Sequence, residues 1–346
     1  MPVTRAIMPA MKAKIVLISF GAILGLLVTG LAYPYLRPPA DLPAGSQFET
    51  LEEFQRVMVE SDERDLKSDR SVSLRSIIAP HPSLQIMYEL RPNLSVKFQG
   101  VPLQTNDCGM RGPQHSLARD QNTLRIALLG DSFAFGWGVK HEESFAAQLE
   151  SVLNGYLKGE QEVEVLNFSV PGYSTFQEVA LFEEKGLDFD PDLVLVYFVN
   201  NDFGLPFFIK NIYGSGGVIS GQKYAKKSRA KHDLAIRKQQ KRLERMLDPN
   251  RALRRLSELT GEQGIKLFVA INPHPRWRRD KRKLWILREN PEIHFLNLRP
   301  GFEQVVEEQQ ISPAALSLKR DPHPSALKHK ILGELLAGML YSHMLG

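Results

Sequence analysis

The chain of 346 residues contains a single cysteine, Cys108, and this scarcity excludes both an intrachain disulfide and a metal cluster built on cysteines. Other residue types show no metal-ligand pattern, and internal repeats are absent. The sequence therefore predicts no metal, no cofactor and no repeat architecture. What the chain does contain is 43% hydrophobic residues, which is enough for one sizeable core with appendages.

Positive charge is unevenly distributed, and its surplus lies in two segments. Residues 223–255 carry 13 Lys/Arg against 3 Asp/Glu, and residues 276–288 carry 7 against 1, a joint surplus of 16 positive charges. The net charge of the chain is +5, so the remainder carries −11. The first segment lies in a predicted basic helical insert, residues 223–262. Three interpretations fit this insert: a solvated surface helix, a cover that binds an anionic substrate, or a contact with anionic lipid head groups.

Residues 15–36 carry no charge. The run is 22 residues long, and about 20 apolar residues span a bilayer core. Three basic residues precede it and favour a cytoplasmic N-terminus: Arg5, Lys12 and Lys14. The sequence therefore predicts a cytoplasmic tail over 1–14 and a retained transmembrane anchor over 15–36. A cleaved signal peptide is the alternative, although its apolar region is usually only about 7–15 residues long.

Apolar runs alternate with helical patterns from residue 123 onward. The runs predict five strands, at 124–129, 163–168, 193–198, 266–271 and 294–298. Helices are expected at 143–157, 176–185, 224–259, 302–308 and 326–345. This alternation predicts a flavodoxin-like three-layer α/β/α fold with five parallel strands in the order 2-1-3-4-5. We expect residues 37–70 to be a linker with a juxtamembrane helix and 71–122 to be an N-terminal extension packed on the domain formed by 123–346.

Polar residues follow the carboxyl ends of the predicted strands, which is where open α/β sheets place their sites. Ser132 follows the first strand, at a helix start whose backbone N–H groups favour an anion. That position suits a nucleophile whose attack on a carbonyl creates an oxyanion. Gly172 follows the second strand, and Asn200 and Asn201 follow the third. Three groups could therefore donate to the oxyanion: the Ser132 N–H, the Gly172 N–H and the Asn201 side chain.

The loop Asp321-Pro-His323-Pro precedes the last predicted helix. A serine nucleophile needs a base and the base needs an orienting group, and this one loop can supply both as His323 and Asp321. Each feature also has a purely structural explanation, with Gly172 as a turn residue and the asparagines and Asp321 as helix caps. Four such features at the ends of successive elements nevertheless favour a single site.

These four stretches resemble the blocks of the SGNH, or GDSL-type, hydrolases, and Asn106–Gly112 resembles a membrane-anchored bacterial subset of that family. The resemblance implies that Ser132 is the nucleophile and that it forms the oxyanion hole with Gly172 and Asn201. It also implies that Asp321 and His323 complete the catalytic triad.

The sequence departs from the family pattern in the third block, where Val199 stands in the usual place of glycine. Asn200 therefore remains an alternative to Asn201 as the oxyanion donor. The Gly-x-Ser-x-Gly elbow of the α/β-hydrolases is not matched, because residue 134 is alanine.

The resemblance implies a serine esterase, and the uncharged run at 15–36 places it in the cytoplasmic (inner) membrane, with its catalytic domain expected outside the cytoplasm, in the periplasm. It would act on acyl, in first place acetyl, esters through an acyl-serine intermediate. The expected partners are an acylated small molecule or an envelope glycan, and the membrane through residues 15–36; nucleic acid is not expected. One alternative is an O-acyltransferase that modifies an envelope glycan, served by a membrane acyl-donor protein. The second is a non-catalytic envelope protein that binds a glycan or a partner.

Overall fold

The structure is a computed structural model that describes residues 70–215, 219–220, 223–224 and 234–345, together with residues 50, 52–53, 55–56 and 66. The predicted tail and transmembrane anchor, residues 1–36, lie outside the described residues, as does most of 37–70. Within the described part, no helix has both the length and the apolar character that a membrane crossing requires.

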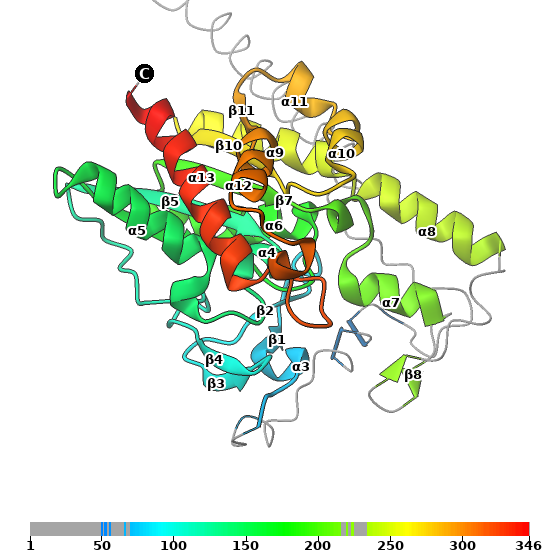
Figure 1. Ribbon diagram of the computed structural model, residues 1–346. Helices are drawn as coiled ribbons and strands as arrows, with labels where there is room; N and C mark the ends of the chain where they lie inside the picture. The colour runs from blue at the N-terminus through cyan, green and yellow to red at the C-terminus, as the bar shows by residue number, and fades with distance from the viewer. Residues whose placement is uncertain are drawn as a thin grey trace, which may run out of the picture. The chain divides into compact units, whose positions relative to one another are not determined.

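Five parallel strands form the central sheet in the order β11-β10-β7-β5-β6, which confirms the predicted order 2-1-3-4-5 (Figure 1). Their bounds are β5 (Thr123–Gly130), β6 (Glu162–Asn167), β7 (Leu193–Phe198), β10 (Lys266–Ile271) and β11 (Ile293–Leu296). Alternate side chains of β5 enter different core clusters, with Leu128 on one face and Leu129 on the other. Both faces of the sheet are covered, and this is why the strand is apolar throughout.

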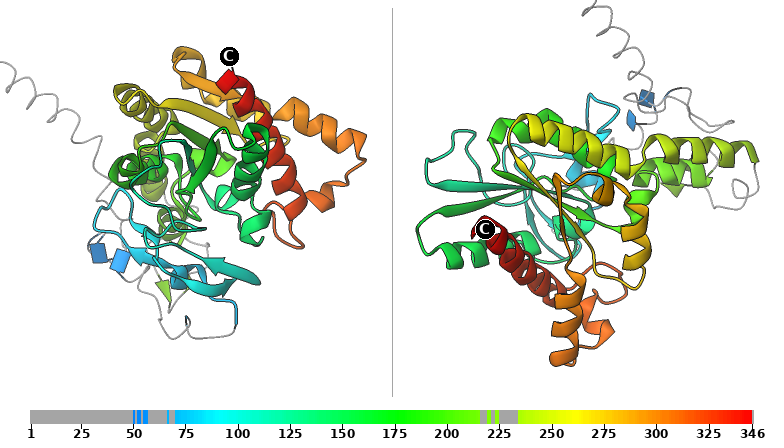
Figure 2. Two further views of the ribbon diagram at one scale, coloured as in Figure 1. Left: turned by 90° about the vertical axis from the view of Figure 1, so that its left-hand side faces the viewer. Right: turned by 90° about the horizontal axis from the view of Figure 1, so that it is seen from above.

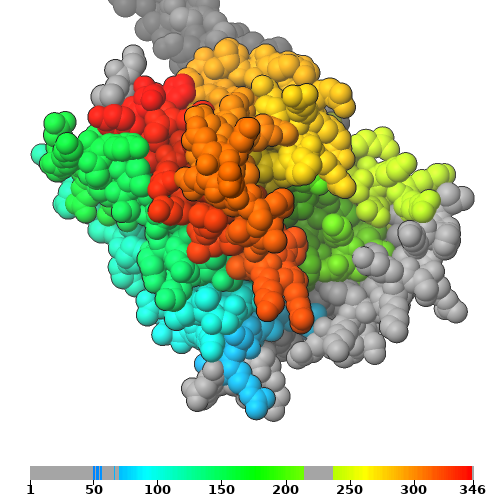
Figure 3. Space-filling view, in the orientation of Figure 1, coloured from blue at the N-terminus to red at the C-terminus, as the bar shows by residue number. Residues whose placement is uncertain are grey.

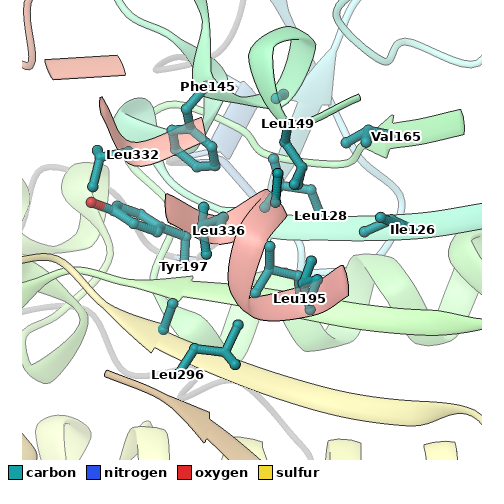
Figure 4. Packing of buried hydrophobic residues seen from close by; sticks show 14 of the residues in the cluster. Ile126, Leu128, Phe145, Leu149, Val165, Leu195, Tyr197, Leu296, Leu332 and Leu336 are labelled. Carbon is teal, nitrogen blue, oxygen red and sulfur yellow. The ribbon is translucent and has the colours of Figure 1, made fainter. Parts of the chain in front are cut away.

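One face of the sheet is covered by α5 (Phe145–Leu157), α12 (Arg299–Glu308) and α13 (Ala326–Leu345). Leu149 of α5 and Leu336 of α13 are fully buried against Leu128 and Leu195 of the sheet (Figure 4). The outer surface of this layer is seen in Figure 3, where α13 in red lies between α5 in green and α12 in orange. The predicted last helix, 326–345, is confirmed.

The opposite face is covered by α6 (Thr175–Leu181), α9 (Pro249–Glu262), α10 (Trp277–Lys283) and α11 (Ile286–Glu289), which completes the three layers (Figure 2). The predicted single helix over 224–259 is wrong. The structure has α8 (Leu234–Met246) and α9, because Pro249 cannot donate a backbone hydrogen bond and Asp248 caps the new helix. Leu253 of α9 is fully buried in the core, so the basic segment 223–262 contains a helix of the sheet layer.

The N-terminal extension packs with α7 (Phe207–Ser215) and α8 around a third apolar cluster. It consists of α3 (Leu74–Ile77), the antiparallel pair β1 (Ile78–Pro80) and β2 (Tyr88–Leu90), and the pair β3 (Ser95–Phe98) and β4 (Val101–Gln104). A two-stranded ribbon, β8 (Ile219–Ser220) and β9 (Lys223–Tyr224), follows α7. The Tyr88 ring makes edge contacts with Tyr173 and Phe208, which links the extension to segments that follow β6 and β7.

Candidate active site

Ser132 lies at a sharp turn from strand to helix. It lies two residues after the end of β5 and is the first residue of the short helix α4 (Ser132–Phe135), where backbone N–H groups have no acceptor inside the helix. The Asp131 side chain caps this helix by accepting from the Phe133 N–H at 2.9 Å. A Cβ at Gly130 would lie 2.5 Å from the Ala134 Cβ, so this turn requires glycine.

His323 bridges Ser132 and Asp321. Its Nε2 is 2.8 Å from the Ser132 Oγ, and its Nδ1 is 2.5 Å from the Asp321 Oδ1. Burial raises the pKa of Asp321, but hydrogen bonds from the backbone and ring of His323 outweigh that effect and hold the pKa below its ordinary value. The ionised carboxylate accepts the Nδ1–H, and Nε2 therefore offers its lone pair to the serine hydroxyl.

Trp137 supports this pair, and the sequence reasoning missed it. Its Nε1 donates to the Asp321 Oδ2 at 3.3 Å, and its indole stacks on the His323 ring with centroids 4.8 Å apart and planes 16° apart. The sequence signal that could have found Trp137 is the glycine on each side of it, since two such glycines indicate a tight turn. Gly136 and Gly138 both have positive φ, 85° and 72°. So tight a turn, close in sequence to the candidate nucleophile, fixes the orientation of the Trp137 side chain.

Arg111 gives the segment Asn106–Gly112 a structural role. Its buried guanidinium donates to the carbonyls of Phe135, at 2.8 Å, and Val139, at 2.6 Å, and also to that of Gly136. These carbonyls belong to the loop that carries Trp137. Burial lowers the pKa of Arg111 to about 10, so the side chain stays charged at neutral pH. The segment Asn106–Gly112 therefore holds the Trp137 loop in place through the hydrogen bonds of Arg111.

Gly172 is fixed in a left-handed conformation, with φ at 84°. A Cβ there would lie 2.9 Å from both the Phe207 Cβ and the Tyr88 hydroxyl, so glycine is required. The Tyr88 hydroxyl donates to the Pro171 carbonyl at 2.9 Å, and the Phe207 N–H donates to the Gly172 carbonyl at 3.0 Å. The N-terminal extension and α7 thus clamp the second candidate oxyanion donor.

The two asparagines point to different places. The Asn201 Nδ2 donates to the Asp131 Oδ2 at 2.6 Å, beside the candidate nucleophile. The Asn200 Nδ2 instead donates to both carboxylate oxygens of Asp280, at 3.1 and 3.0 Å. The structure therefore brings Asn201, and not Asn200, to Ser132.

Three buried carboxyl groups, those of Asp131, Glu178 and Asp202, lie near the turn that carries Asn201. Burial raises the pKa of Asp202 and of Glu178 well above their ordinary values; repulsion from Asp131 adds to both shifts, and repulsion from Asp202 adds to that of Glu178. Burial also raises the pKa of Asp131, against the hydrogen bonds from Asn201 and the Phe133 N–H. The Asp202 Oδ2 accepts from the Val199 N–H at 2.8 Å and so fixes the 3₁₀ turn Asn200–Phe203 that carries Asn201.

A cavity of about 260 Å³ opens at the Ser132 hydroxyl. Ser132, Gly172, Asn201 and His323 all line it. Most of its remaining wall is apolar and comes from the N-terminal extension, α4 with the Trp137 loop, the segment after β6, and α7 with the residues just before it: Leu74, Phe133, Trp137, Tyr173, Leu205 and Phe207. One apolar cavity thus holds a hydroxyl, an adjacent base and three N–H groups, an arrangement that suits acyl transfer.

Solved structures with a similar fold have low sequence identity to this chain. A catalytic mutant of Axe2, an acetylxylan esterase from Geobacillus stearothermophilus, is 20% identical over 62% of this chain and 92% of the other, with a TM-score of 0.41. The psychrotrophic esterase EstA from Pseudoalteromonas sp. is 14% identical over 65% of this chain and 100% of the other, with a TM-score of 0.38. No curated protein matches the sequence.

The sequence profile of the GDSL-like Lipase/Acylhydrolase family matches residues 128–330, which is more than half of the 346 residues. The matched range begins inside β5, just before Ser132, and ends after the loop that carries Asp321 and His323. The family predicted from the sequence motifs is therefore confirmed: the chain belongs to the GDSL-like lipase/acylhydrolase family and is by class an ester hydrolase.

Proposed function

We propose that this protein hydrolyses acyl esters, in first place acetyl esters, through a covalent acyl intermediate on Ser132. The observation that carries the proposal is the pair of hydrogen bonds from Asp321 through His323 to Ser132, 2.5 and 2.8 Å long, at the mouth of a cavity. A binding protein has no need for this continuous chain of hydrogen bonds, and this disfavours the non-catalytic alternative.

The proposed mechanism gives each group a role. As the Ser132 Oγ attacks the acyl carbon, its proton passes to the His323 Nε2, and Asp321 stabilises the resulting imidazolium. The oxyanion would lie within reach of the N–H groups of Ser132, Gly172 and Asn201. His323 then returns the proton to the departing alcohol, and water activated by the same imidazole releases the acid and restores the serine.

We also propose that residues 15–36 anchor the protein in the cytoplasmic membrane, with residues 37–346 on the outer side. The uncharged run of 22 residues and the basic residues ahead of it support this topology. Envelope glycans would then be the accessible esters. A C-terminal reporter that is active only outside the cytoplasm tests the topology; activity of a cytoplasm-specific reporter instead would contradict it. A mature N-terminus near Tyr33 would identify a cleaved signal.

Transfer of the acyl group to a glycan hydroxyl is the second candidate, since both reactions share the acyl-serine intermediate. The observation that favours it is a second cavity, of about 660 Å³, which adjoins the first and is large enough for an acceptor sugar. Supplying an acetyl donor together with envelope polysaccharide separates the two reactions. Hydrolysis yields acetate, and transfer yields acetylated glycan.

The direct test of the esterase is the turnover of p-nitrophenyl acetate by Ser132→Ala. Removing a triad serine should lower kcat by about 10⁴-fold or more. Ser342→Ala is the matched control, because this exposed serine near the end of α13 bonds only to the Gly338 carbonyl among the described residues. Equal turnover by Ser132→Ala and the wild type would remove Ser132 from the mechanism.

A further inference from the structure

A second cavity, of about 660 Å³, lies beside the Ser132 cavity and shares two wall residues with it, Phe133 and Pro322. Pro322 stands between Asp321 and His323, so the two cavities meet at the loop that carries the candidate base. The new cavity differs in chemistry, because charged and amide side chains stand among the apolar residues that line it. They come from α12, from α13 and from the segment that follows β10: Asn272, His274, Arg299, Glu303 and Lys328.

Most of these charged groups already neutralise one another. Arg299 binds Glu303 through Nε, at 2.7 Å, and Nη2, at 2.6 Å. His274 accepts from the Arg276 N–H on Nδ1 and so carries its proton on Nε2, which it donates to Asp280 at 2.7 Å. Burial lowers the pKa of His274, so this ring is neutral and already hydrogen-bonded.

Lys328 is different. Its Nζ donates to the Asn272 Oδ1 at 3.1 Å, and Asn272 is held in turn by the Tyr197 hydroxyl at 3.0 Å. Across the residues that the structure describes, no carboxylate forms an ion pair with Lys328. An ammonium group has three donors, and the bond to Asn272 uses one of them. The Nζ also lies 5.6 Å from the centre of the Phe302 ring, a cation–π contact that does not neutralise its charge. Burial lowers the pKa of Lys328 to about 8, which is the behaviour of a desolvated cation that lacks a nearby anion.

The two cavities together can hold the two parts of an ester, the acyl group and the alcohol. The Ser132 cavity has mainly apolar walls and suits the acyl group, whereas the second cavity sets charged and amide side chains among its apolar ones and suits a sugar. We propose that the second cavity binds the alcohol side of the substrate and that Lys328 binds an anionic substituent there, a carboxylate or a phosphate. This inference rests on the proposed esterase function and narrows its substrate to esters of acidic sugars.

The experiment compares three acetylated monosaccharides: glucuronate, glucose 1-phosphate and the neutral methyl glucoside. Wild-type protein should show a kcat/KM for at least one anionic ester about tenfold above that for the neutral ester, the size of one charge-assisted contact. The ratio should fall to about one in Lys328→Met and in Lys328→Gln. Because the ratio is taken within each variant, a loss of folded protein does not affect it.

Lys330→Met is the matched control. Lys330 lies two residues along α13, is exposed, and faces Glu334 at 3.9 Å, so the ratio should keep its wild-type value. The anionic ester that is preferred identifies the group, carboxylate or phosphate. Equal kcat/KM for all three esters in the wild type, or a preference that survives in both Lys328 variants, overturns the inference.

Calorimetry with free glucuronate and glucose 1-phosphate, which contain no ester, separates this inference from the proposed function. Binding in the wild type that is lost in Lys328→Gln supports the anion site, provided that the three esters are not all turned over without preference. Turnover of all three esters with no preference and no binding overturns the anion site and leaves the esterase intact. Binding that depends on Lys328 without turnover of any ester overturns the esterase and keeps the site.

Discussion

Replacement of Asn201 by alanine tests the oxyanion hole against its nearest alternative in the sequence. The Asn201 amide donates to Asp131 and lines the Ser132 cavity, so one N–H is held in place while the other is available to the substrate. Loss of one preorganised oxyanion donor costs about 10²–10³ in kcat, or about 2.7–4 kcal/mol. The effect should fall on kcat more than on KM, because the oxyanion forms only during the reaction.

Asn200→Ala is the matched comparison, with the same change one residue earlier. Its amide is bonded to Asp280, so kcat should fall less than tenfold. The assay is steady-state turnover of p-nitrophenyl acetate, with circular dichroism as the check on folding. A loss in Asn200→Ala equal to or larger than that in Asn201→Ala would refute the assignment of the oxyanion donor.

Three further predictions concern the groups around the triad. Trp137→Phe keeps a ring against His323 but loses the hydrogen bond to Asp321. Because the lost group is one modest neutral donor, kcat should fall roughly 3–10-fold with little change in KM. An unchanged kcat would make Trp137 a packing residue only. Arg111→Ala leaves three loop carbonyls without their charged donor. The free energy of unfolding, measured by urea titration, should therefore fall by about 2–4 kcal/mol. A loss below about 0.5 kcal/mol would contradict the proposed role of Arg111 in holding the loop. Asp321 has a pKa below its ordinary 3.8 in the folded protein, so its ionised form stabilises the fold at neutral pH and that contribution is lost as the pH falls through the folded-state pKa. The stability difference between wild type and Asp321→Asn should therefore shrink from pH 7 to pH 3, and a constant difference would argue against the shift.

The sheet and its order could be predicted because its strands are buried on both faces. Runs such as 193–198 contain no polar residue, and this pattern leaves few alternatives to a parallel strand. The strand order then places the ends of β5, β6 and β7 together, which brings Ser132 near Gly172 and Asn201. The loop with His323 and Asp321 could be predicted as well, since short spacing makes the pair a local feature. The catalytic roles of these residues stay predictions until variants are measured.

Contacts between distant segments could not be predicted. The clamp of Tyr88 on Pro171 joins residues 83 positions apart, and the contact of Trp137 with Asp321 joins residues 184 apart. Neither pair leaves a periodic pattern in the sequence. The sequence pattern predicts α8 and α9 as one helix because their apolar positions continue in one register, although Asp248-Pro249 is a helix start signal. The choice between Asn200 and Asn201 needed the position of Asp280, which lies 80 residues away from Asn200.

The central claim is that Ser132 is a nucleophile activated by His323, and a fluorophosphonate probe tests it most directly. Attack by the Ser132 Oγ on phosphorus displaces fluoride and leaves a stable covalent adduct, which intact-mass analysis and peptide mapping can locate. The account predicts one adduct per chain, on Ser132, formed far more slowly in His323→Ala and absent in Ser132→Ala. An adduct on another serine, or no adduct at all on folded wild-type protein, would contradict it.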